Sequence, residues 1–291
     1  MTDTYRGMGR AALDREYNAR ATVPDIMPIL AEYRARTEAA KAALPGARIG
    51  LPYGPTEPER LDIYPAATPG PAPVFVFIHG GYWRLLDAAD SGFMAPYLTA
   101  AGACVVAVNY ALAPAATLDE IVRQCRAALA WLHGNIGRFG GDPARIHVAG
   151  SSAGGHLAAM LAAGGDWPSR LGLPPRPVAG ATLLSGLYEL EPLRLCHVNE
   201  WMRLDEAAAA RNSPALLPPP APGTPLVFSV AETETGEFKA QTRAQAEYCA
   251  EAGCAVTLVP APAGSNHFDI VFQLCADTPL ARAVLRAMGL R

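Results

Sequence analysis

The pentapeptide Gly150-Ser151-Ser152-Ala153-Gly154 lies between an apolar stretch, residues 145–149, and a segment of helical character, residues 156–161. A G-x-S-x-G pattern in this position is typical of a tight strand-to-helix turn that exposes its central residue. Its glycines allow two backbones to pass closely, and the helix directs its first N–H groups toward developing negative charge. We therefore predict that Ser152 is a nucleophile and that Ser151, at the variable position, points away from the apex of the turn. A plain glycine- and serine-rich loop is the alternative, because these residue types are common in this chain.

Strands and helices are predicted to alternate on both sides of this turn. Apolar runs predict strands at residues 74–78, 104–108, 145–149, 181–185, 225–230 and 255–259, with shorter candidates at 48–53 and 59–64. Helical patterns cover residues 118–133, 237–252 and about 269–288. This alternation predicts an α/β protein with a mostly parallel central sheet and helices on both faces. Ligands bind such sheets beyond the carboxyl ends of the strands, so residues just after the strands are the candidates for chemistry.

Two segments fall outside the alternation. Residues 1–46 are predicted to form an N-terminal helical arm or lid, because apolar residues recur there at helical spacing, with an interruption at Pro24 and an end at Pro45. Residues 47–291 then form the main domain. Within it, residues from about 190 to 223 carry a proline cluster and are predicted to form an insertion that caps the site.

Composition narrows the function classes. Hydrophobic residues make up 51% of the 291 residues and charged residues 18%, which indicates a folded protein with a sizeable core. With 24 basic and 27 acidic residues and no basic cluster, neither nucleic acid nor an anionic membrane is an expected partner. The first residues show no apolar signal segment and no run is long enough to span a bilayer, so we expect a cytoplasmic location.

Cysteine usage and the arm bear on cofactors and assembly. The six cysteines are scattered without C-x-x-C spacing, so we expect buried reduced thiols rather than disulfides or a metal site. The expected partner is a small-molecule substrate. The apolar residues of the arm have two candidate partners, the core of the same chain and a second subunit, so a homodimer is one expectation.

His267 is the predicted general base. A serine hydroxyl needs a base within hydrogen-bond reach, and that base needs a third group to orient it. His267 lies in the loop 264–269, which follows the last predicted strand. Since the imidazole must be neutral to accept a proton, we expect activity to rise with pH over the range in which histidine titrates. Structural roles are expected for the histidines within a helix, a strand, the segment behind the turn and the insertion: His133, His147, His156 and His197.

The orienting acid is expected in the loop 231–237, because the order along the chain is nucleophile, acid, base. This loop offers three glutamates. Glu234 is central and is the first choice, whereas Glu237 has the position of a first-turn helix residue. Glu232 remains open.

The segment His79-Gly80-Gly81-Tyr82-Trp83 follows the buried strand 74–78 and is predicted to supply an oxyanion hole. A glycine pair lets the backbone approach a ligand and turn its N–H groups inward. The predicted donors are the N–H groups of Gly81, Tyr82 and Ala153. His79 is expected to brace the loop. Tyr82 and Trp83 are expected either to form an aromatic wall of the substrate pocket or simply to pack the loop.

Taken together, these segments resemble the kynurenine formamidase (arylformamidase) group of α/β-hydrolases, which is related to the hormone-sensitive-lipase-like esterases. The resemblance covers nearly the whole chain. The matching stretches are EYNAR at 16–20, LDIY at 61–64, HGGYW at 79–83, NYALAP at 109–114, GGDP at 140–143, SAGGHLA at 152–158, SGLYEL at 185–190, EF at 237–238 and HF at 267–268.

The resemblance implies an α/β-hydrolase fold and an aryl formamide substrate such as N-formylkynurenine. It supports Ser152 and His267 in their roles and assigns Glu234 to the acid position. Two departures weaken the transfer of the substrate: the family acid is usually aspartate, and Ser151 stands where formamidases often have histidine.

The expected activity is therefore that of a serine hydrolase that forms an acyl-enzyme and uses no metal and no cofactor. A carboxylesterase or amidase acting on other small aryl or short-chain acyl substrates is the alternative. A hydrolase-fold binding protein without turnover is the third reading.

Overall fold

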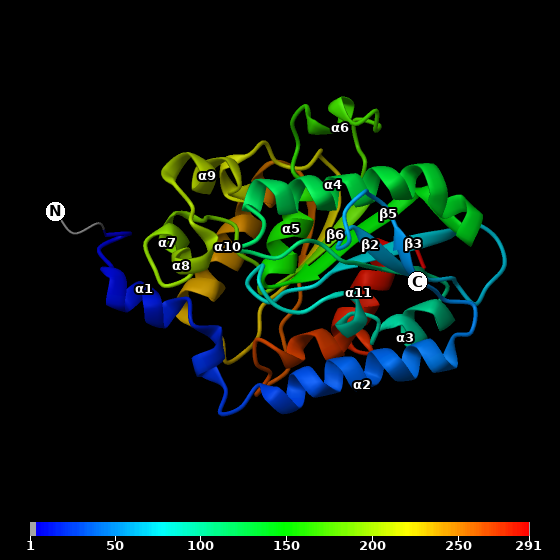
Figure 1. The fold of residues 1–291 in the computed structure, drawn as a ribbon, viewed down its shortest axis with the longest axis horizontal. Coiled ribbons are helices and arrows are strands. Elements are labelled where there is room, and N and C mark those ends of the chain that lie inside the picture. Colours follow the sequence, from blue (N-terminus) through cyan, green and yellow to red (C-terminus); the bar gives the residue numbers. More distant parts are fainter. Residues whose placement is uncertain (1–3, 291) are drawn as a thin grey trace.

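A single eight-stranded sheet runs through the computed structural model, which describes residues 4–290 (Figure 1). The strands lie in the order β1-β2-β4-β3-β5-β6-β7-β8. The β1–β2 and β2–β4 pairs are antiparallel, and all pairs from β4 to β8 are parallel. The strands are β1 (Arg48–Pro52), β2 (Arg60–Tyr64), β3 (Ala72–Ile78), β4 (Cys104–Val108), β5 (Gly141–Ser151), β6 (Gly180–Leu184), β7 (Pro225–Ser229) and β8 (Ala255–Leu258). The predicted α/β class and all eight predicted strands are confirmed.

Helices cover both faces of the sheet. In Figure 1, α4 and α5 lie above it, whereas α2, α3 and α11 lie below. The helices are α1 (Arg10–Glu16), α2 (Met27–Ala43), α3 (Ala95–Ala100), α4 (Leu118–Asn135), α5 (Ala153–Ala162), α6 (Trp167–Arg170), α7 (Glu191–Arg194), α8 (Asn199–Met202), α9 (Glu206–Arg211), α10 (Gly236–Glu251) and α11 (Pro279–Ala287). Short 3-10 turns are η1 (Ala19–Thr22), η2 (Ala88–Asp90), η3 (Ile136–Phe139), η4 (Pro214–Leu216) and η5 (Asp269–Leu274).

The central strand β3 divides its side chains between two hydrophobic cores. Val74, Val76 and Ile78 pack into the core beneath α4, α5 and α10, whereas Phe75 and Phe77 pack into the core beneath α3 and α11. Alternation of this kind follows from the two-residue period of a strand, and a strand covered on both faces reads as a continuous apolar run. The sheet is therefore a rigid support for the loops at its carboxyl end.

The predicted closing helix at 269–288 is wrong. The chain forms η5 instead, passes through a short loop, and begins α11 at Pro279. Thr278 caps α11, since its side chain accepts a hydrogen bond from the N–H of Ala281 at 3.1 Å. A proline at the first helical position and a threonine before it are start signals, so the helix begins here rather than ten residues earlier.

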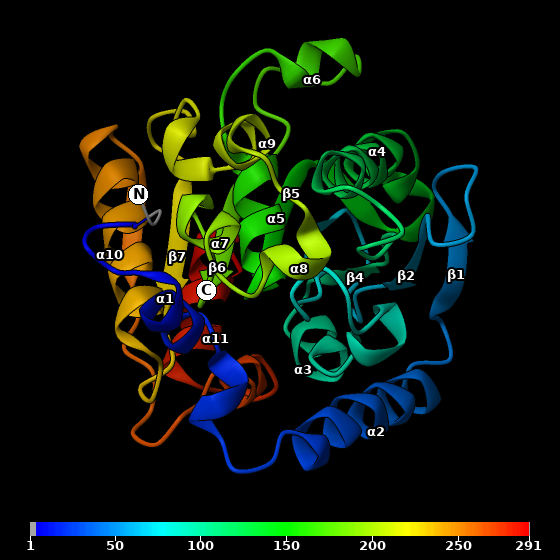
Figure 2. The ribbon, with the colours of Figure 1, turned by 60° about the vertical axis from the view of Figure 1, so that its left-hand side comes forward.

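Helix α1 of the N-terminal segment lies beside the insertion, and its Arg10 and Asp14 contact Glu200 and His197. Figure 2 shows α1 in blue and α7 and α8 in yellow-green in front of the strands. The predicted division into an arm at 1–46, a main domain at 47–291 and a cap at about 190–223 stays a prediction. Its outermost residues, 1–3 and 291, lie outside the described residues.

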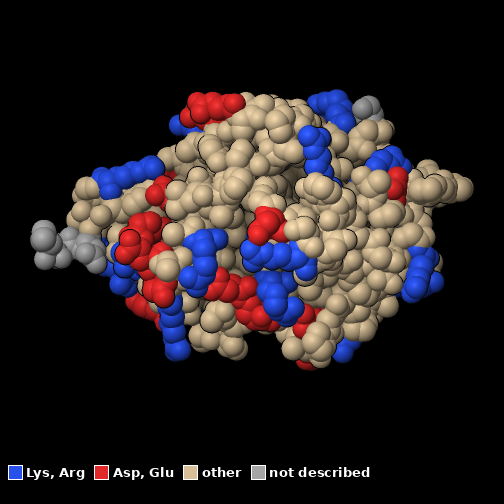
Figure 3. Space-filling view, turned by 90° about the horizontal axis from the view of Figure 1, so that it is seen from above, with Lys and Arg blue, Asp and Glu red and all other residues tan. Residues whose placement is uncertain are grey.

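Surface charge and hydropathy are unexceptional. On the face that Figure 3 shows, basic and acidic side chains lie among one another, as the near balance of 24 and 27 residues would give. Within residues 4–290, no helix is long and apolar enough to cross a membrane. All six cysteines are free; five are buried and Cys275 is half-buried.

Candidate active site

Ser152 lies at the turn between β5 and α5 in a conformation that side chains rarely adopt, with φ of 57° and ψ of −124°. The residues two positions before and two positions after it must be glycine. A Cβ on Gly150 would lie 2.2 Å from the carbonyl oxygen of Gly154, and a Cβ on Gly154 would lie 2.0 Å from that of Ile78. The Ser152 N–H donates to the Leu184 carbonyl at 2.9 Å. The turn is thus fixed by close backbone packing, and a constrained residue of this kind is typical of functional sites.

His267 and Glu234 form a buried pair. The Nδ1 of His267 lies 2.5 Å from the Oε1 of Glu234, and the two side chains are 4% and 0% exposed. The other two glutamates of the loop lie elsewhere. Glu232 accepts a hydrogen bond from the Gly264 N–H at 3.3 Å, and Glu237 lies in the first turn of α10, where it accepts from Tyr17 at 3.2 Å. Of the three candidates, the structure brings Glu234 to the imidazole.

The loops that carry this pair are tied together. The carbonyl of Ser265 accepts from the N–H of Thr233 at 3.0 Å, and the Ser265 hydroxyl accepts from the N–H of Glu232 at 3.2 Å. The side chain of Asn266 accepts from the N–H of Phe268 at 2.9 Å, which folds the chain tightly around His267. These bonds fix the acid relative to the imidazole before any ligand arrives, as preorganisation requires.

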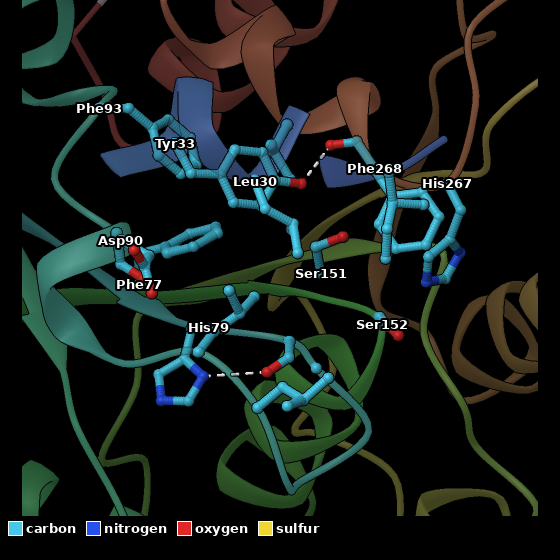
Figure 4. Close-up of a pocket in the computed structure, with 17 residues that line it drawn as sticks. Leu30, Tyr33, Phe77, His79, Asp90, Phe93, Ser151, Ser152, His267 and Phe268 are labelled. Carbon is cyan, nitrogen blue, oxygen red and sulfur yellow. Dashed lines mark hydrogen bonds between the residues drawn. The ribbon is translucent and has the colours of Figure 1, made fainter. Parts of the chain in front are cut away.

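Two cavities meet at Ser152 and His267, and both residues line both of them. The first has a volume of about 70 Å³ and is mostly apolar, with walls that include Leu30, Phe77 and Phe93. Figure 4 shows its lining, with Ser151 and Ser152 pointing in different directions. Ser151 lines only this cavity.

The second cavity is wider, at about 260 Å³, and carries polar and aromatic groups. Its lining includes Asn18, Arg20, Tyr82, Arg84, His197 and Trp201. The hydroxyl of Ser152 makes no hydrogen bond to another group among residues 4–290. Bonds between a nucleophile and its base often tighten only when the substrate is bound. A substrate placed across the junction of the two cavities would contact both Ser152 and His267.

Two of the three predicted oxyanion donors line the wider cavity, and the third follows Ser152 in the chain. Gly81 and Tyr82 line the wider cavity next to Ser152, and Ala153 is the first residue of α5. In the described part of the chain, none of the three N–H groups donates a hydrogen bond to another protein group. Gly81 has φ of 96°, and a Cβ there would lie 2.3 Å from the Leu85 carbonyl oxygen, so this turn requires glycine. Unpaired N–H groups facing a cavity are available to an anion.

His79 braces this loop, as expected. Its Nδ1 donates to the Gly80 carbonyl at 2.9 Å, and its ring stacks on Tyr110 with centroids 4.1 Å apart. The hydroxyl of Tyr110 donates to the His79 carbonyl at 2.8 Å. Burial lowers the pKa of His79 to about 4, so the ring is neutral at physiological pH.

Of the two expectations for Trp83, a wall of the pocket and packing of the loop, the structure agrees with packing. Trp83 is fully buried and lines neither cavity. Its indole N–H donates to Nδ1 of His156 at 3.3 Å, and Nε2 of His156 in turn donates to the Asn212 carbonyl at 2.7 Å. A positive φ of 57° at Trp83 turns its side chain into the core. The residue therefore ties the loop to α5 and to the insertion.

Trp201, on α8, takes the place that was predicted for Trp83. It lines the wider cavity beside Tyr82, with ring centroids 6.1 Å apart, and its indole N–H donates to the Tyr82 carbonyl at 3.1 Å. Sequence reasoning missed this role, although it placed Trp201 in a segment expected to cap the site. His197, for which a purely structural role was expected, also lines this cavity.

The N-terminal segment contacts three loops of the site. The hydroxyl of Tyr82 donates to the Tyr17 carbonyl at 2.5 Å, and the hydroxyl of Thr235 donates to the Glu16 carbonyl at 2.6 Å. On α2, the hydroxyl of Tyr33 donates to the Phe268 carbonyl. The segment thereby connects the oxyanion loop, the acid loop and the histidine loop.

One cluster in the described part of the chain has the composition of a metal site: Asp14, Cys196 and His197. Its carboxylate is already engaged, because Asp14 pairs with Arg10 at 3.1 Å and accepts from the His197 N–H at 2.5 Å. Burial raises the pKa of the Cys196 thiol to about 11, which disfavours the thiolate that a metal binds. These contacts suit a structural role.

Known proteins resemble this chain over nearly its whole length. A family model described as BD-FAE matches residues 61–168. The chain is 33% identical over 298 residues to a kynurenine formamidase of Salmo salar and 31% identical over 300 residues to one of Danio rerio, with 98% of each chain covered in both cases. The solved structure of esterase B from Lactobacillus rhamnosis superposes with a TM-score of 0.69 at 20% identity, covering 94% of this chain and 95% of that one. The last likeness establishes the α/β-hydrolase fold.

Proposed function

Because the chain belongs to the kynurenine formamidase family of α/β-hydrolases, we propose that it cleaves an aryl formamide of the N-formylkynurenine type through an acyl-enzyme on Ser152. Hydrolase activity follows from the family; the substrate and the catalytic residues are the proposal. The observation that carries it is the 2.5 Å pair of Glu234 and His267, which lies at the cavities that Ser152 lines.

The proposed reaction has two steps. The Ser152 oxygen attacks the formyl carbon while Nε2 of His267 accepts the hydroxyl proton, and Glu234 stabilises the imidazolium that forms. His267 then returns the proton to the aryl nitrogen as the carbon–nitrogen bond breaks, leaving a formyl ester on Ser152. Water, deprotonated by His267, attacks this ester and releases formate and the free serine.

The oxyanion of each tetrahedral intermediate would lie against the unpaired N–H groups of Gly81, Tyr82 and Ala153. Loss of one such donor typically costs about 2.7–4 kcal/mol in the barrier. His79 and Trp83 stabilise the loop that carries Gly81 and Tyr82, through neutral hydrogen bonds to the Gly80 carbonyl and to His156. Backbone donors held in this way need no reorganisation as the charge develops.

One observation favours the alternative, a carboxylesterase. A formyl group has no carbon chain, yet the apolar cavity of about 70 Å³ beside Ser152 has room for a short one. An acetyl or propionyl ester would place its chain there and its alcohol in the wider cavity. The aromatic pair of Tyr82 and Trp201 suits an aryl leaving group in either case.

The test is kcat/KM for N-formylkynurenine beside p-nitrophenyl acetate, for the wild type and Ser152→Ala. We expect turnover of the formamide that the substitution abolishes. A fluorophosphonate probe followed by intact mass should label the wild type and Ser151→Ala but not Ser152→Ala. Turnover of the ester alone would refute the formamidase and support the carboxylesterase. A wild type that is neither labelled nor active would refute both and support a hydrolase-fold binding protein.

Assembly and location remain expectations from the sequence. Met27, at the start of α2, is 61% exposed, which supports the proposal of a homodimer through this segment. Light scattering on the purified chain tests it, and a monomer at all concentrations would contradict it. We also propose a cytoplasmic location, from the sequence alone.

A further inference from the structure

The wider cavity is lined by cationic and neutral side chains. Arg20 comes from η1, Arg84 from the oxyanion loop and His197 from the segment before α8. No aspartate or glutamate is among its described lining residues. Asp14, the carboxylate that contacts His197, is itself paired with Arg10. The lining of this cavity therefore carries two guanidinium groups and no carboxylate, although the whole chain has a net charge of −3 and the Glu234 carboxylate lies behind His267.

Neither guanidinium has an anionic partner. Within the described chain, Arg20 and Arg84 take part in no ion pair and no side-chain hydrogen bond, in contrast to Arg123, which pairs with Glu59 at 2.9 Å and Glu120 at 2.7 Å. A guanidinium offers a planar fork of donors that matches a carboxylate. Two such forks at one cavity are unused by the protein.

Arg84 is held in place despite its exposure. The guanidinium carbon of Arg84 lies over the Trp201 ring, 3.9 Å from its centroid, in a cation–π contact. Arg20 lies three residues after Tyr17, whose carbonyl accepts the hydrogen bond from Tyr82. The charge of Arg84 thus lies against the aromatic wall that would receive an aryl group, and Arg20 lies in the lining of the same cavity.

We propose that the wider cavity is a leaving-group site for an aryl compound with an anionic tail, and that Arg20 and Arg84 bind its carboxylate. This inference rests on the proposed function, since it assigns the aryl side of the scissile bond to this cavity. An aryl ring against Tyr82 and Trp201 directs a flexible carboxylate tail toward the two guanidinium groups. Neutral aryl substrates lack this contact and bind more weakly.

Equilibrium binding separates this inference from catalysis. Titration calorimetry measures the Kd of 4-phenylbutyrate and of its uncharged amide, 4-phenylbutyramide, for the wild type, Arg20→Gln and Arg84→Gln. We expect the carboxylate to bind more tightly than the amide to the wild type. Each substitution should raise the Kd of the carboxylate about three- to tenfold, the range for a solvent-exposed charged contact, and change that of the amide less than about twofold.

Two further variants sharpen the test. Arg84→Lys keeps the charge and the stacking position, so the preference for the carboxylate should partly survive. Arg15→Gln removes an exposed arginine of α1 that does not line this cavity, and should leave both Kd values unchanged. If Arg20→Gln, Arg84→Gln and Arg15→Gln all raise the Kd of the carboxylate equally, the effect comes from the net charge of the protein and not from this cavity. That result would overturn the proposal.

The wild type binding both compounds equally would also overturn it, as would a carboxylate affinity unaffected by Arg20→Gln and Arg84→Gln. Because no turnover is measured, an enzyme that fails to cleave N-formylkynurenine can still pass this test. Conversely, an active formamidase that shows no preference for the carboxylate would refute the inference and leave the proposed function intact.

Discussion

Replacing Glu234 with glutamine tests the buried pair directly. The side chain is fully buried, its Oε1 lies 2.5 Å from Nδ1 of His267, and its Oε2 has no partner among the described residues. Glutamine has nearly the same shape but no charge, so the change removes a charge-assisted hydrogen bond worth about 1.5–3 kcal/mol and the counter-ion of the imidazolium. Its amide can also donate to Nδ1, which would place the ring proton on Nε2 and block the base.

We expect kcat/KM to fall about 10³- to 10⁴-fold, which corresponds to roughly 4–5.5 kcal/mol in the barrier. Glu234→Asp retains the charge but withdraws the carboxylate by one methylene, so a smaller loss of about 10- to 100-fold is expected. Steady-state kinetics on p-nitrophenyl acetate and N-formylkynurenine measure both, and thermal unfolding checks that the variants are folded.

Glu232→Gln is the matched control, because its carboxylate contacts only the Gly264 N–H among the described residues. We expect kcat/KM to change less than about threefold. The reasoning fails if Glu234→Gln is folded and nearly as active as the wild type. It also fails if Glu232→Gln loses as much activity as Glu234→Gln.

Three further outcomes follow from the packing. Gly154→Ala should prevent folding or destabilise the chain severely, whereas Gly134→Ala, in α4 with nothing within 4 Å of its Cβ, should be neutral or stabilise it by up to about 1 kcal/mol in urea unfolding. Trp201→Phe removes the hydrogen bond to the Tyr82 carbonyl, so we expect kcat/KM for aryl substrates to fall about 5- to 30-fold without loss of folding; an unchanged value would argue against this wall. Burial lowers the pKa of three histidines from 6.5, to about 4 for His79 and His156 and to about 3 for His147. Between about pH 6.5 and 4 only the unfolded chain binds these protons. As the pH is lowered through this range, the free energy of unfolding should therefore decrease, by up to about 1.4 kcal/mol per pH unit for each histidine. A urea-unfolding free energy that stays constant from pH 7 to 5 would contradict this.

Much of the fold could be predicted because the relevant signals are local. Strands β3 and β4 are buried on both faces and therefore apolar at nearly every position, which identifies them without knowledge of their neighbours. The glycines around Ser152 are equally readable, because the turn tolerates no Cβ at Gly150 or Gly154. By contrast, the helical pattern of residues 269–288 predicts one long helix. The start of α11 at Thr278 and Pro279 lies within that pattern, so the pattern alone does not show that the helix begins there.

The sequence left two roles open for Trp83 for a different reason. Tyr82 and Trp83 are adjacent and both have positive φ, of 49° and 57°. From the sequence alone, two neighbouring aromatics after a glycine pair can form one wall or pack the loop. The loop instead turns one ring toward the cavity and the other into the core, where His156 accepts its N–H. Which of the two rings is buried depends on the partner that it finds in the folded chain. That partner, His156, is 73 residues away in the sequence.

The contribution of the N-terminal segment was beyond sequence reasoning for a chemical reason. Two of its contacts with the site run through main-chain oxygens: the carbonyls of Glu16 and Tyr17 accept from Thr235 and Tyr82. Every residue has a carbonyl, so such contacts leave no signature in the residue types that accept. Yet these bonds carry Arg20 to the cavity and connect the oxyanion loop with the loop of Glu234. A backbone carbonyl can therefore be as important to the geometry of the site as a side chain. Removal of the Thr235 hydroxyl tests the Glu16 carbonyl specifically, whereas substitution of Glu16 also removes the carboxylate that accepts from the Glu237 N–H at 3.1 Å.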